Sequence, residues 1–479
     1  MNNRPDSPCQ LCIHGHFYQP PREDPFTGHI PREPSAAPYK DWNERITAEC
    51  YKPNARRGHF EQISFNLGGT LARWLDENGH QTYERIVAAE QAHLGAHGVG
   101  NGLAQPVHHT ILPLARRRDK ICQVRWGIAS FEHRFGHLPE GMWLPEMAVD
   151  YETLEIMAAE GIRYTILSDE QVYGDLEVGG GPYRVALPSG SEIAVFVRDR
   201  QLSNDLSFGM PDSAYVDEWV KERMAWRCKQ DGLHLVATDG ETFGHHHRQG
   251  VEVLSHILGA GHWHGYQLTT LGLYLRHNPP QAEIKVIENT AWSCAHGLDR
   301  WVVGCDCTAG DSRWKGALRR ALDNLACDLD TVYECEAQQL GIEPWSLRDG
   351  YVAVVLGQIS GEAFLTGNGL GHLMGEETQR LLRLLEAQFH RQRTYISCTF
   401  FFDELDRYEP RYAIANGIRA LALTHQATGK DLSTRFRRDL SVAKSARTRL
   451  TAADIYDEIA TKVELEARPG PPLCGRARP

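Results

Sequence analysis

Residues 9–290 alternate between short apolar segments and longer segments with helical periodicity. Strands that alternate with helices are typical of a parallel α/β layout, because each helix carries the chain back to the same edge of the sheet. Roughly seven such strands can be counted, which favours a barrel over an open sheet. The pattern predicts strands at residues 9–13, 62–66, 141–144, 164–167, 192–197, 233–239 and 283–288.

The pattern changes near residue 311, where helical periodicity replaces the alternation. Apolar residues between Trp314 and Val332 fall on one helical face, and further long helical patterns follow. They cover residues 371–393, 410–427 and 432–464. We therefore predict a disordered segment at residues 1–8, a barrel domain at 9–310, a helical domain at 311–465 and a disordered tail at 466–479.

The composition excludes some classes of partner. The formal net charge is −11, which argues against a nucleic-acid partner because phosphate binding requires a basic surface. No apolar run approaches the roughly 18 residues that span a bilayer, so no membrane partner is expected. The residues from Met1 to Gln10 lack the apolar segment of a signal peptide. Twelve cysteines without an export signal indicate free thiols in a reducing compartment, and we predict a cytoplasmic protein.

Two carboxylates follow predicted strands. Glu146 comes just after residues 141–144, and Asp239 ends the strand at residues 233–239. In α/β barrels, side chains at the carboxyl ends of the strands face substrate rather than core. Two carboxyl groups that face each other across one gap are the minimum set of catalytic groups for cleaving a glycosidic bond. A lone acid after a strand is more often a surface-loop residue, so the neighbouring residues must decide.

The residues around both acids favour a site. Exposing the large apolar side chain of Trp143 to water at the rim would cost free energy, unless the ring packs against a sugar face or the core. The segment Asp239–His247 contains two acids, Asp239 and Glu241, together with two glycines and three histidines. Its glycines allow the backbone to approach a ligand closely.

Two tryptophans follow the last predicted strand. Trp292 and Trp301 stand just beyond residues 283–288. Aromatic planes bind the apolar faces of sugars, so tryptophans at a barrel mouth suit a glucan channel. Either residue alone is equally compatible with the core, and the position after the strand favours the site.

Several histidines resemble parts of a metal site. His14 and His16 lie two residues apart at a predicted strand end and therefore point the same way. No Asp or Glu beside them completes a ligand set, so we interpret them as hydrogen-bonding residues that line a pocket. The consecutive histidines His245–His247 point in different directions, which disfavours one shared metal.

Cys294-x-His296 followed by Cys305-x-Cys307 is the other metal-like pattern. Paired zinc ligands more often have two residues between them, and the linker at residues 297–304 is unusually short. Free thiols are the default interpretation here. No metal or other cofactor is predicted, and the sequence leaves open whether these four residues bind a metal.

At these residues the sequence resembles glycoside hydrolase family 57, which has five short signature regions. Candidates for all five are present, at residues 14–20, 63–75, 143–146, 239–245 and 291–301. The third and fourth regions are the specific ones. By resemblance, the family's nucleophile maps onto Glu146 and its general acid/base onto Asp239. The candidate substrate-binding residues are His14, His16, Gln19, Trp143, Glu241, His245, Trp292 and Trp301.

The resemblance implies an incomplete (β/α)7 barrel followed by an α-helical C-terminal domain, in a subgroup with a distinctive C-terminal extension. It also implies retaining catalysis on α-1,4-glucans or maltooligosaccharides through a covalent glycosyl-enzyme intermediate, without a metal. Asp239 must then keep its proton near neutral pH, so its pKa should be raised by burial and by the charge of Glu146. The sequence does not decide among an amylase, a 4-α-glucanotransferase and a branching enzyme.

Two alternatives remain open. One is a metal-dependent carbohydrate deacetylase on a similar barrel, which would use His14, His16 and the cluster His245–His247. The other is a glucan-binding protein that kept the cleft and lost its activity.

Overall fold

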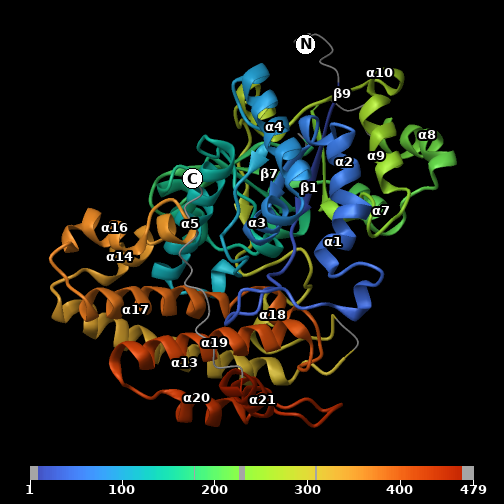
Figure 1. The fold of residues 1–479 in the computed structure, drawn as a ribbon. Helices are drawn as coiled ribbons and strands as arrows, with labels where there is room; N and C mark the ends of the chain where they lie inside the picture. The colour runs from blue at the N-terminus through green and yellow to red at the C-terminus, as the bar shows by residue number, and fades with distance from the viewer. Residues whose placement is uncertain (1–8, 177–178, 226–231, 308–309, 466–479) are drawn as a thin grey trace. The chain divides into compact units, whose positions relative to one another are not determined.

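The computed structural model describes residues 9–465 except 177–178, 226–231 and 308–309 (Figure 1). The predictions of disorder at both ends therefore lie outside the described residues. The chain divides into two compact units. The first comprises Met1–Pro21, Arg32–Val107 and Phe131–Trp292, and the second comprises Arg22–Pro31, His108–Ser130 and Ser293–Pro479.

The first unit is organised around β1, which lies between two parallel neighbours. The strand order of the main sheet is β3-β2-β1-β8, and β9 also pairs with the first residues of β1, all in parallel. β1 is buried along nearly its whole length, which is typical of a parallel sheet covered on both faces. The bounds are β1 (Cys9–Phe17), β2 (Ser64–Leu67), β3 (Gly102–Leu103), β8 (Leu233–Asp239) and β9 (Tyr266–Leu268).

Parallel pairing continues beyond β3. Single bridges join Ala104 to Met142 and Gly141 to Tyr164. Tyr164 begins β4 (Tyr164–Ser168), which pairs in parallel with β7 (Glu192–Arg198). These pairings confirm the parallel α/β layout. The remaining described strands are antiparallel: β6 (Tyr183–Ala186) forms a hairpin with β7, and β5 (Val172–Tyr173) pairs with β10 (Lys285–Val286).

Helices connect the strands of the first unit, as parallel pairing requires (Figure 1). They are α1 (Trp42–Ile46), α2 (Lys52–Arg56), α3 (Gly69–Asn78), α4 (His80–His97), α6 (Tyr151–Ala159), α7 (Arg200–Phe208), α8 (Val216–Trp219), α9 (Gly250–Gly259), α10 (Gly261–His264) and α11 (Leu271–His277). One further helix, α5 (Arg117–Phe135), contributes residues to both units.

The structure corrects several predicted boundaries. β1 extends to Phe17, so His14 and His16 are both part of the strand, and His16 lies next to its carboxyl end. Residues 141–144 form single bridges instead of a strand, because a turn begins at Pro145, which has no N–H to donate. The last predicted strand shortens to Lys285–Val286. After β7 and α7, the short helix α8 continues into the π-helical turn Val220–Ala225.

The second unit is helical, as predicted. Its described helices are α12 (Asp299–Val302), α13 (Trp314–Gln339), α14 (Pro344–Gly350), α15 (Val352–Val355), α16 (Gly361–Leu365), α17 (Glu376–Arg393), α18 (Cys398–Phe401), α19 (Tyr408–Thr428), α20 (Ser433–Leu440) and α21 (Ala452–Leu465). α17 packs along α19, and α13 packs against both α17 and α20 (Figure 1). The helix predicted at residues 432–464 is in fact two helices, because the chain turns between α20 and α21.

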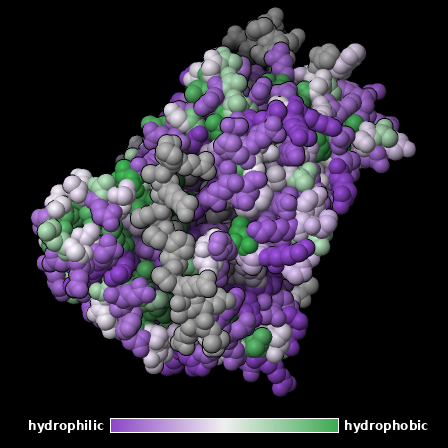
Figure 2. Space-filling model, viewed as in Figure 1, coloured by the Kyte–Doolittle hydropathy of each residue, from purple (hydrophilic) through white to green (hydrophobic). Residues whose placement is uncertain are grey.

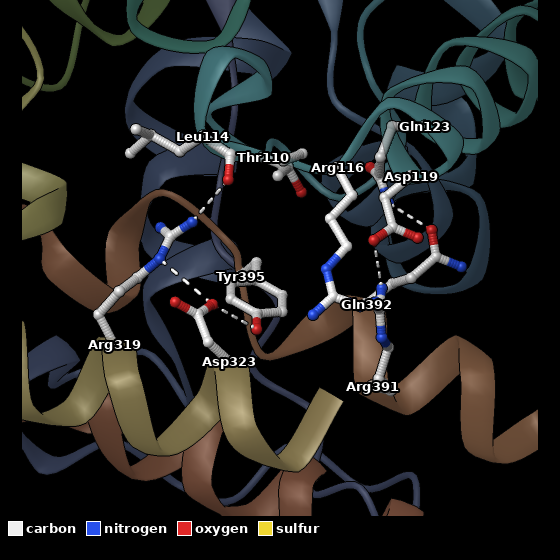
Figure 3. A pocket seen from close by; sticks show the side chains of 11 residues that line it. Thr110, Leu114, Arg116, Asp119, Gln123, Arg319, Asp323, Arg391, Gln392 and Tyr395 are labelled. Carbon is white, nitrogen blue, oxygen red and sulfur yellow. Dashed lines mark hydrogen bonds and ion pairs between the residues drawn. The ribbon is translucent and has the colours of Figure 1, made fainter. Parts of the chain in front are cut away.

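A small polar pocket lies within the second unit (Figure 3). Asp119 at its wall pairs with Arg391 at 2.8 Å and with Arg348 at 2.7 Å. The cavity volume is about 40 Å³, which leaves room for only a few water molecules. This pocket is therefore an internal ion-pair cluster that is too small for a sugar.

The described surface and cysteines bear on two further predictions. Hydrophilic side chains predominate on the face shown in Figure 2. Across the described residues, none of the helices combines the length and the apolar character that a membrane span requires.

Nine described cysteines are free, but Cys9 is disulfide-bonded, so the prediction of free thiols is wrong at that position.

Candidate active site

Three neighbouring strands bring polar side chains to one level of the sheet. In the register of β1 with its neighbours, His16 lies opposite Asn66 of β2 and Asp239 of β8. Asp239 is the last residue of β8, as the sequence predicted. Because parallel strands present their carboxyl ends at the same edge, these three residues lie together at the edge where α/β proteins bind ligands.

Glu146 lies in a strained turn just after the bridge at Met142. Within the 3₁₀ turn Pro145–Met147, Glu146 and Met147 have φ angles of 58° and 49°. This left-handed backbone is costly for residues other than glycine. Trp292 holds the turn, because its backbone N–H donates to the Glu146 carbonyl at 3.0 Å and its indole Nε1–H donates to Glu146 Oε2 at 3.1 Å. The carboxylate is therefore oriented by a residue far along the chain.

Glu146 and Asp239 belong to one electrostatic site. Burial and the negative charge of Glu146 raise the pKa of Asp239 to about 7, while the positive charge of Arg198 opposes this shift. The raised pKa predicted for Asp239 is thus confirmed. Near neutral pH, a protonated carboxyl and a nearby carboxylate can coexist, which is the combination that general acid catalysis beside a nucleophile requires.

Glu241 adds a third carboxyl beside these two. It is buried, it accepts a hydrogen bond from the hydroxyl of Tyr51, and it is hydrogen-bonded to Gln19. Burial and the charge of Asp239 raise the pKa of Glu241 to about 8. Gly240 separates the two acids, and a Cβ there would lie 2.3 Å from the ring of Phe17. The turn after β8 therefore needs glycine at this position.

His14 and His16 form a buried wall next to the acids. Burial lowers the pKa of His14 to about 3 and that of His16 to about 4, so both are neutral. A ring nitrogen of each lies 3.1 Å from Asn66 Oδ1. Both rings stack on Trp143, at centroid distances of 5.0 and 4.7 Å, and Trp143 is fully buried. This arrangement fits the interpretation of hydrogen-bonding histidines rather than metal ligands.

Arg198, at the end of β7, is a site residue that the sequence interpretation missed. Its side chain is buried, donates to Ser168 Oγ at 3.2 Å and lies 5.0 Å from the ring centroid of Trp292. It also interacts electrostatically with Asp239. Its position at the carboxyl end of a strand was the available signal, but an arginine there is usually a solvated residue.

Two further predicted site residues have hydrogen-bond partners of their own. His245 Nδ1 is hydrogen-bonded to Glu49 Oε2 at 2.6 Å, and His247 Nε2 bonds instead to the Ser207 carbonyl, so the consecutive histidines do point in different directions. Trp301 belongs to the second unit, where it is fully buried and donates to the Ser397 carbonyl at 3.2 Å. No face of that indole is open to a sugar, so Trp301 packs in the core of its unit.

A larger cavity lies in the first unit. It is lined mainly by residues of β7, α7 and the start of β8, among them Val197, Arg198 and Asn204, and its volume is about 830 Å³. That volume is in the range of small-molecule sites, roughly 300–1,000 Å³. Neither Glu146 nor Asp239 lines this cavity. We therefore assign the active site from the positions of the two acids and not from the cavity. Arg198 belongs to both the cavity and the active site.

Comparisons with known proteins agree with this geometry. A family model described as Glycosyl hydrolase family 57 matches residues 30–286, and a domain of unknown function (DUF3536) matches residues 311–468. The chain is 27% identical over 187 residues to Alpha-amylase 1 of Dictyoglomus thermophilum, covering 38% of this chain and 26% of the relative. It is 29% identical over 163 residues to the 1,4-alpha-glucan branching enzyme of Thermococcus kodakarensis, covering 28% and 24%. The chain spans about a quarter of the length of these curated relatives.

Solved structures show the same fold at low identity. An exo-type maltose-forming amylase from Pyrococcus sp. ST04 matches with a TM-score of 0.73 at 12% identity, covering 94% of this chain and 88% of the other. A branching enzyme from Thermococcus kodakaraensis matches with a TM-score of 0.58 at 13% identity, covering 93% and 96%. Because the family model covers more than half of the chain, this protein belongs to Glycosyl hydrolase family 57.

Proposed function

We propose that the protein is a retaining glycoside hydrolase or transglycosylase that acts on α-1,4-glucans. The observation that carries this proposal is the placement of two carboxyls in one site: Asp239 ends β8, and the charge of Glu146, together with burial, acts on Asp239 to raise its pKa to about 7. An ionised carboxylate beside a protonated carboxyl is the pair that retaining glycosidases use. The amylase and branching-enzyme relatives support the substrate class.

In the first step, a carboxylate oxygen of Glu146 attacks the anomeric carbon, and the bond to the leaving glycosidic oxygen breaks. Asp239 gives its proton to that oxygen, so no alkoxide is released. The Trp292 indole N–H fixes the orientation of the attacking carboxylate. The product of this step is a glycosyl ester on Glu146 and a shortened glucan.

In the second step, Asp239 takes a proton from an acceptor hydroxyl, whose oxygen attacks the anomeric carbon of the ester, so that the bond from this carbon to Glu146 breaks and the carboxylate is released. Water as acceptor gives hydrolysis, and a sugar hydroxyl gives transfer or branching. The substrate-binding residues in this proposal are His14, His16, Gln19, Glu241, His245 and Trp292, and the buried Trp143 supports the two histidines through stacking. Arg198 acts on the acid/base, because its charge opposes the rise in the pKa of Asp239.

We also propose that the parallel strands close into an incomplete (β/α)7 barrel. The bridges at Met142 and Tyr164 support this arrangement, as does the hydrogen bond from the Asp199 N–H to the Leu235 carbonyl, which connects the end of β7 to β8. The domain division at residue 311, the cytoplasmic location and the absence of nucleic-acid and membrane partners stay predictions.

Two active-site variants and a product profile test the proposed function. Glu146→Gln and Asp239→Asn should each abolish turnover of maltoheptaose and amylose, and should leave binding of maltoheptaose intact. Glu146→Ala with added azide should form a glycosyl azide of inverted configuration, because the small anion replaces the missing nucleophile. Wild-type products then identify the acceptor: shorter reducing sugars indicate hydrolysis, longer and shorter chains indicate transfer, and new α-1,6 linkages indicate branching.

The two alternatives make different predictions. A glucan-binding protein would bind maltoheptaose and turn over neither substrate at any enzyme concentration, which would contradict the proposal. A deacetylase would lose its activity on acetylated sugars after chelation. The contacts of His14 and His16 with Asn66 and of His245 with Glu49 give that alternative no structural support.

A further inference from the structure

Four metal-binding side chains converge in the second unit. The ligand atoms of Cys294, His296, Cys305 and Cys307 all lie within 4.8 Å of one another. Cys294 Sγ lies 3.6 Å from Cys305 Sγ and 3.8 Å from Cys307 Sγ, and His296 Nδ1 lies 3.3 Å from Cys307 Sγ. These separations far exceed the roughly 2.05 Å of a disulfide bond.

The separations match the edges of a zinc tetrahedron. Bond lengths of about 2.3 Å to sulfur and about 2.05 Å to nitrogen give tetrahedral edges of about 3.8 Å between sulfurs and about 3.6 Å between nitrogen and sulfur. From these observations we propose that Cys294, His296, Cys305 and Cys307 form a closed structural site for one Zn²⁺ ion. Three thiolates and one imidazole fill all four positions, which is typical of structural rather than catalytic zinc.

The fold of the linker explains how closely spaced pairs converge. Residues 297–304 contain the short helix α12 between Gly297 and Gly304, whose φ angles are 69° and 91°. These left-handed positions turn the chain back on itself, so the second pair of ligands meets the first. The unusual spacing, which favoured free thiols at the sequence level, is therefore compatible with a metal site.

Backbone contacts hold the loop around the four ligands. The Gly304 N–H donates to the Asp299 carbonyl at 2.7 Å, and Arg300 donates to the Ser293 carbonyl at 2.8 Å. The same guanidinium lies 4.5 Å from the ring centroid of Phe401, and Trp301 beside it is fully buried. The ligands thus sit on a loop whose centre is anchored in the helical unit.

A buried lysine supplies a second observation. The side chain of Lys315 is fully buried, its Nζ has no hydrogen-bond partner, and Asp403 is 4.0 Å away. Lys315 interacts electrostatically with Cys294 and Cys305. A Zn²⁺ ion with three thiolates carries a net charge of −1, so the complex would provide the negative partner that a buried ammonium group needs.

A second cluster in the first unit is weaker. His256 and His264 both lie near Asp217 Oδ1, at 3.2 and 2.9 Å, and this carboxylate is largely exposed. Ordinary hydrogen bonds account for that arrangement, so no metal is proposed there.

Metal analysis of the full-length protein, purified without chelators, tests the proposal. The wild type should contain stoichiometric zinc, and Cys307→Ser and His296→Ala should lose it. Cys327→Ser is the matched control, because it removes an exposed free thiol of α13 outside the cluster and should keep the zinc. Chelation should lower the Tm of the wild type and of Cys327→Ser, but not that of Cys307→Ser.

Cobalt substitution keeps the test decisive if Cys307→Ser does not fold. Wild-type protein reconstituted with Co²⁺ should show the visible bands of a tetrahedral thiolate site, and His296→Cys should keep the metal and shift these bands. Substoichiometric metal in the wild type, zinc retained in Cys307→Ser, or a disulfide between two of the three cysteines in the freshly purified protein would each overturn the proposal.

Discussion

The indole N–H of Trp292 donates to Glu146 Oε2 at 3.1 Å, and Trp292→Phe removes this donor. The substitution keeps an aromatic ring next to Trp143 and Arg198, which lie 5.2 and 5.0 Å from the Trp292 ring. It also keeps the backbone N–H that donates to the Glu146 carbonyl. The variant therefore isolates the contact between the side chain and the proposed nucleophile.

The expected loss follows from the strength of that contact. A hydrogen bond to a charged group is worth about 1.5–3 kcal/mol. If the bond orients the carboxylate for attack, its removal should lower kcat/KM by roughly 10- to 150-fold, since each 1.4 kcal/mol is about tenfold. We expect kcat to fall by a similar factor, because the bond acts on the reacting group rather than on distant sugar residues.

Steady-state kinetics on maltoheptaose measure this effect, with Tyr266→Phe as control. Tyr266 lies opposite Cys9 at the far end of β1, and its buried hydroxyl donates to the Ile257 carbonyl at 2.6 Å. Removing that bond should cost stability, about 0.5–1.5 kcal/mol, and leave kcat/KM unchanged. A Trp292→Phe enzyme within about threefold of wild type would refute the role assigned to the indole.

Three further predictions follow from the same site. Asp239 must be protonated to act as an acid, and its pKa is raised to about 7, so kcat/KM should fall as the pH rises through that value. Arg198→Met should move this fall to higher pH, because the positive charge of Arg198 lowers the pKa of Asp239. A pH profile of kcat/KM for both enzymes checks this. The pKa of Glu241 rises from 4.5 to about 8 on folding. The free energy of unfolding should therefore decrease as the pH rises between these values, by at most about 1.4 kcal/mol per pH unit. Urea denaturation at several pH values should show a weaker pH dependence for Glu241→Gln than for the wild type. Gly240→Ala should lose about 1–3 kcal/mol of stability, because the added Cβ would clash with the ring of Phe17. Gly95→Ala on α4 should lose none, because its Cβ would meet no atom within 4 Å. Thermal denaturation compares the two variants.

Sequence periodicity predicted the elements that local forces determine. The apolar run of β8 and its terminal Asp239 were located correctly, and so was the helical character of the second unit. In each case burial of an alternating or helical face dictates the element, and a single segment carries the signal.

The contacts that complete the site come from several segments, so no local pattern revealed them. Asn66 was within a predicted strand, yet its bonds to both histidines follow from the register of β1 with β2. Arg198 gains its role from packing on Trp292. The burial of Trp301 could not be predicted, because a tryptophan after a strand suits a site and a core equally well and its burial depends on contacts within the helical unit.

The turn that carries Glu146 shows why the acid itself was easier to predict than its geometry. Left-handed backbone at Glu146 and Met147 costs on the order of 1–3 kcal/mol per residue. Two distant donors offset part of this cost: the Trp292 N–H on the Glu146 carbonyl, and Gln171 Nε2 on the Met147 carbonyl at 2.7 Å. Neither donor adjoins the turn in sequence, and an extended strand was the natural expectation for residues 141–144. The strain lies at the residue whose carboxylate must face the anomeric carbon, which links the cost of this turn to the proposed attack on the glucan.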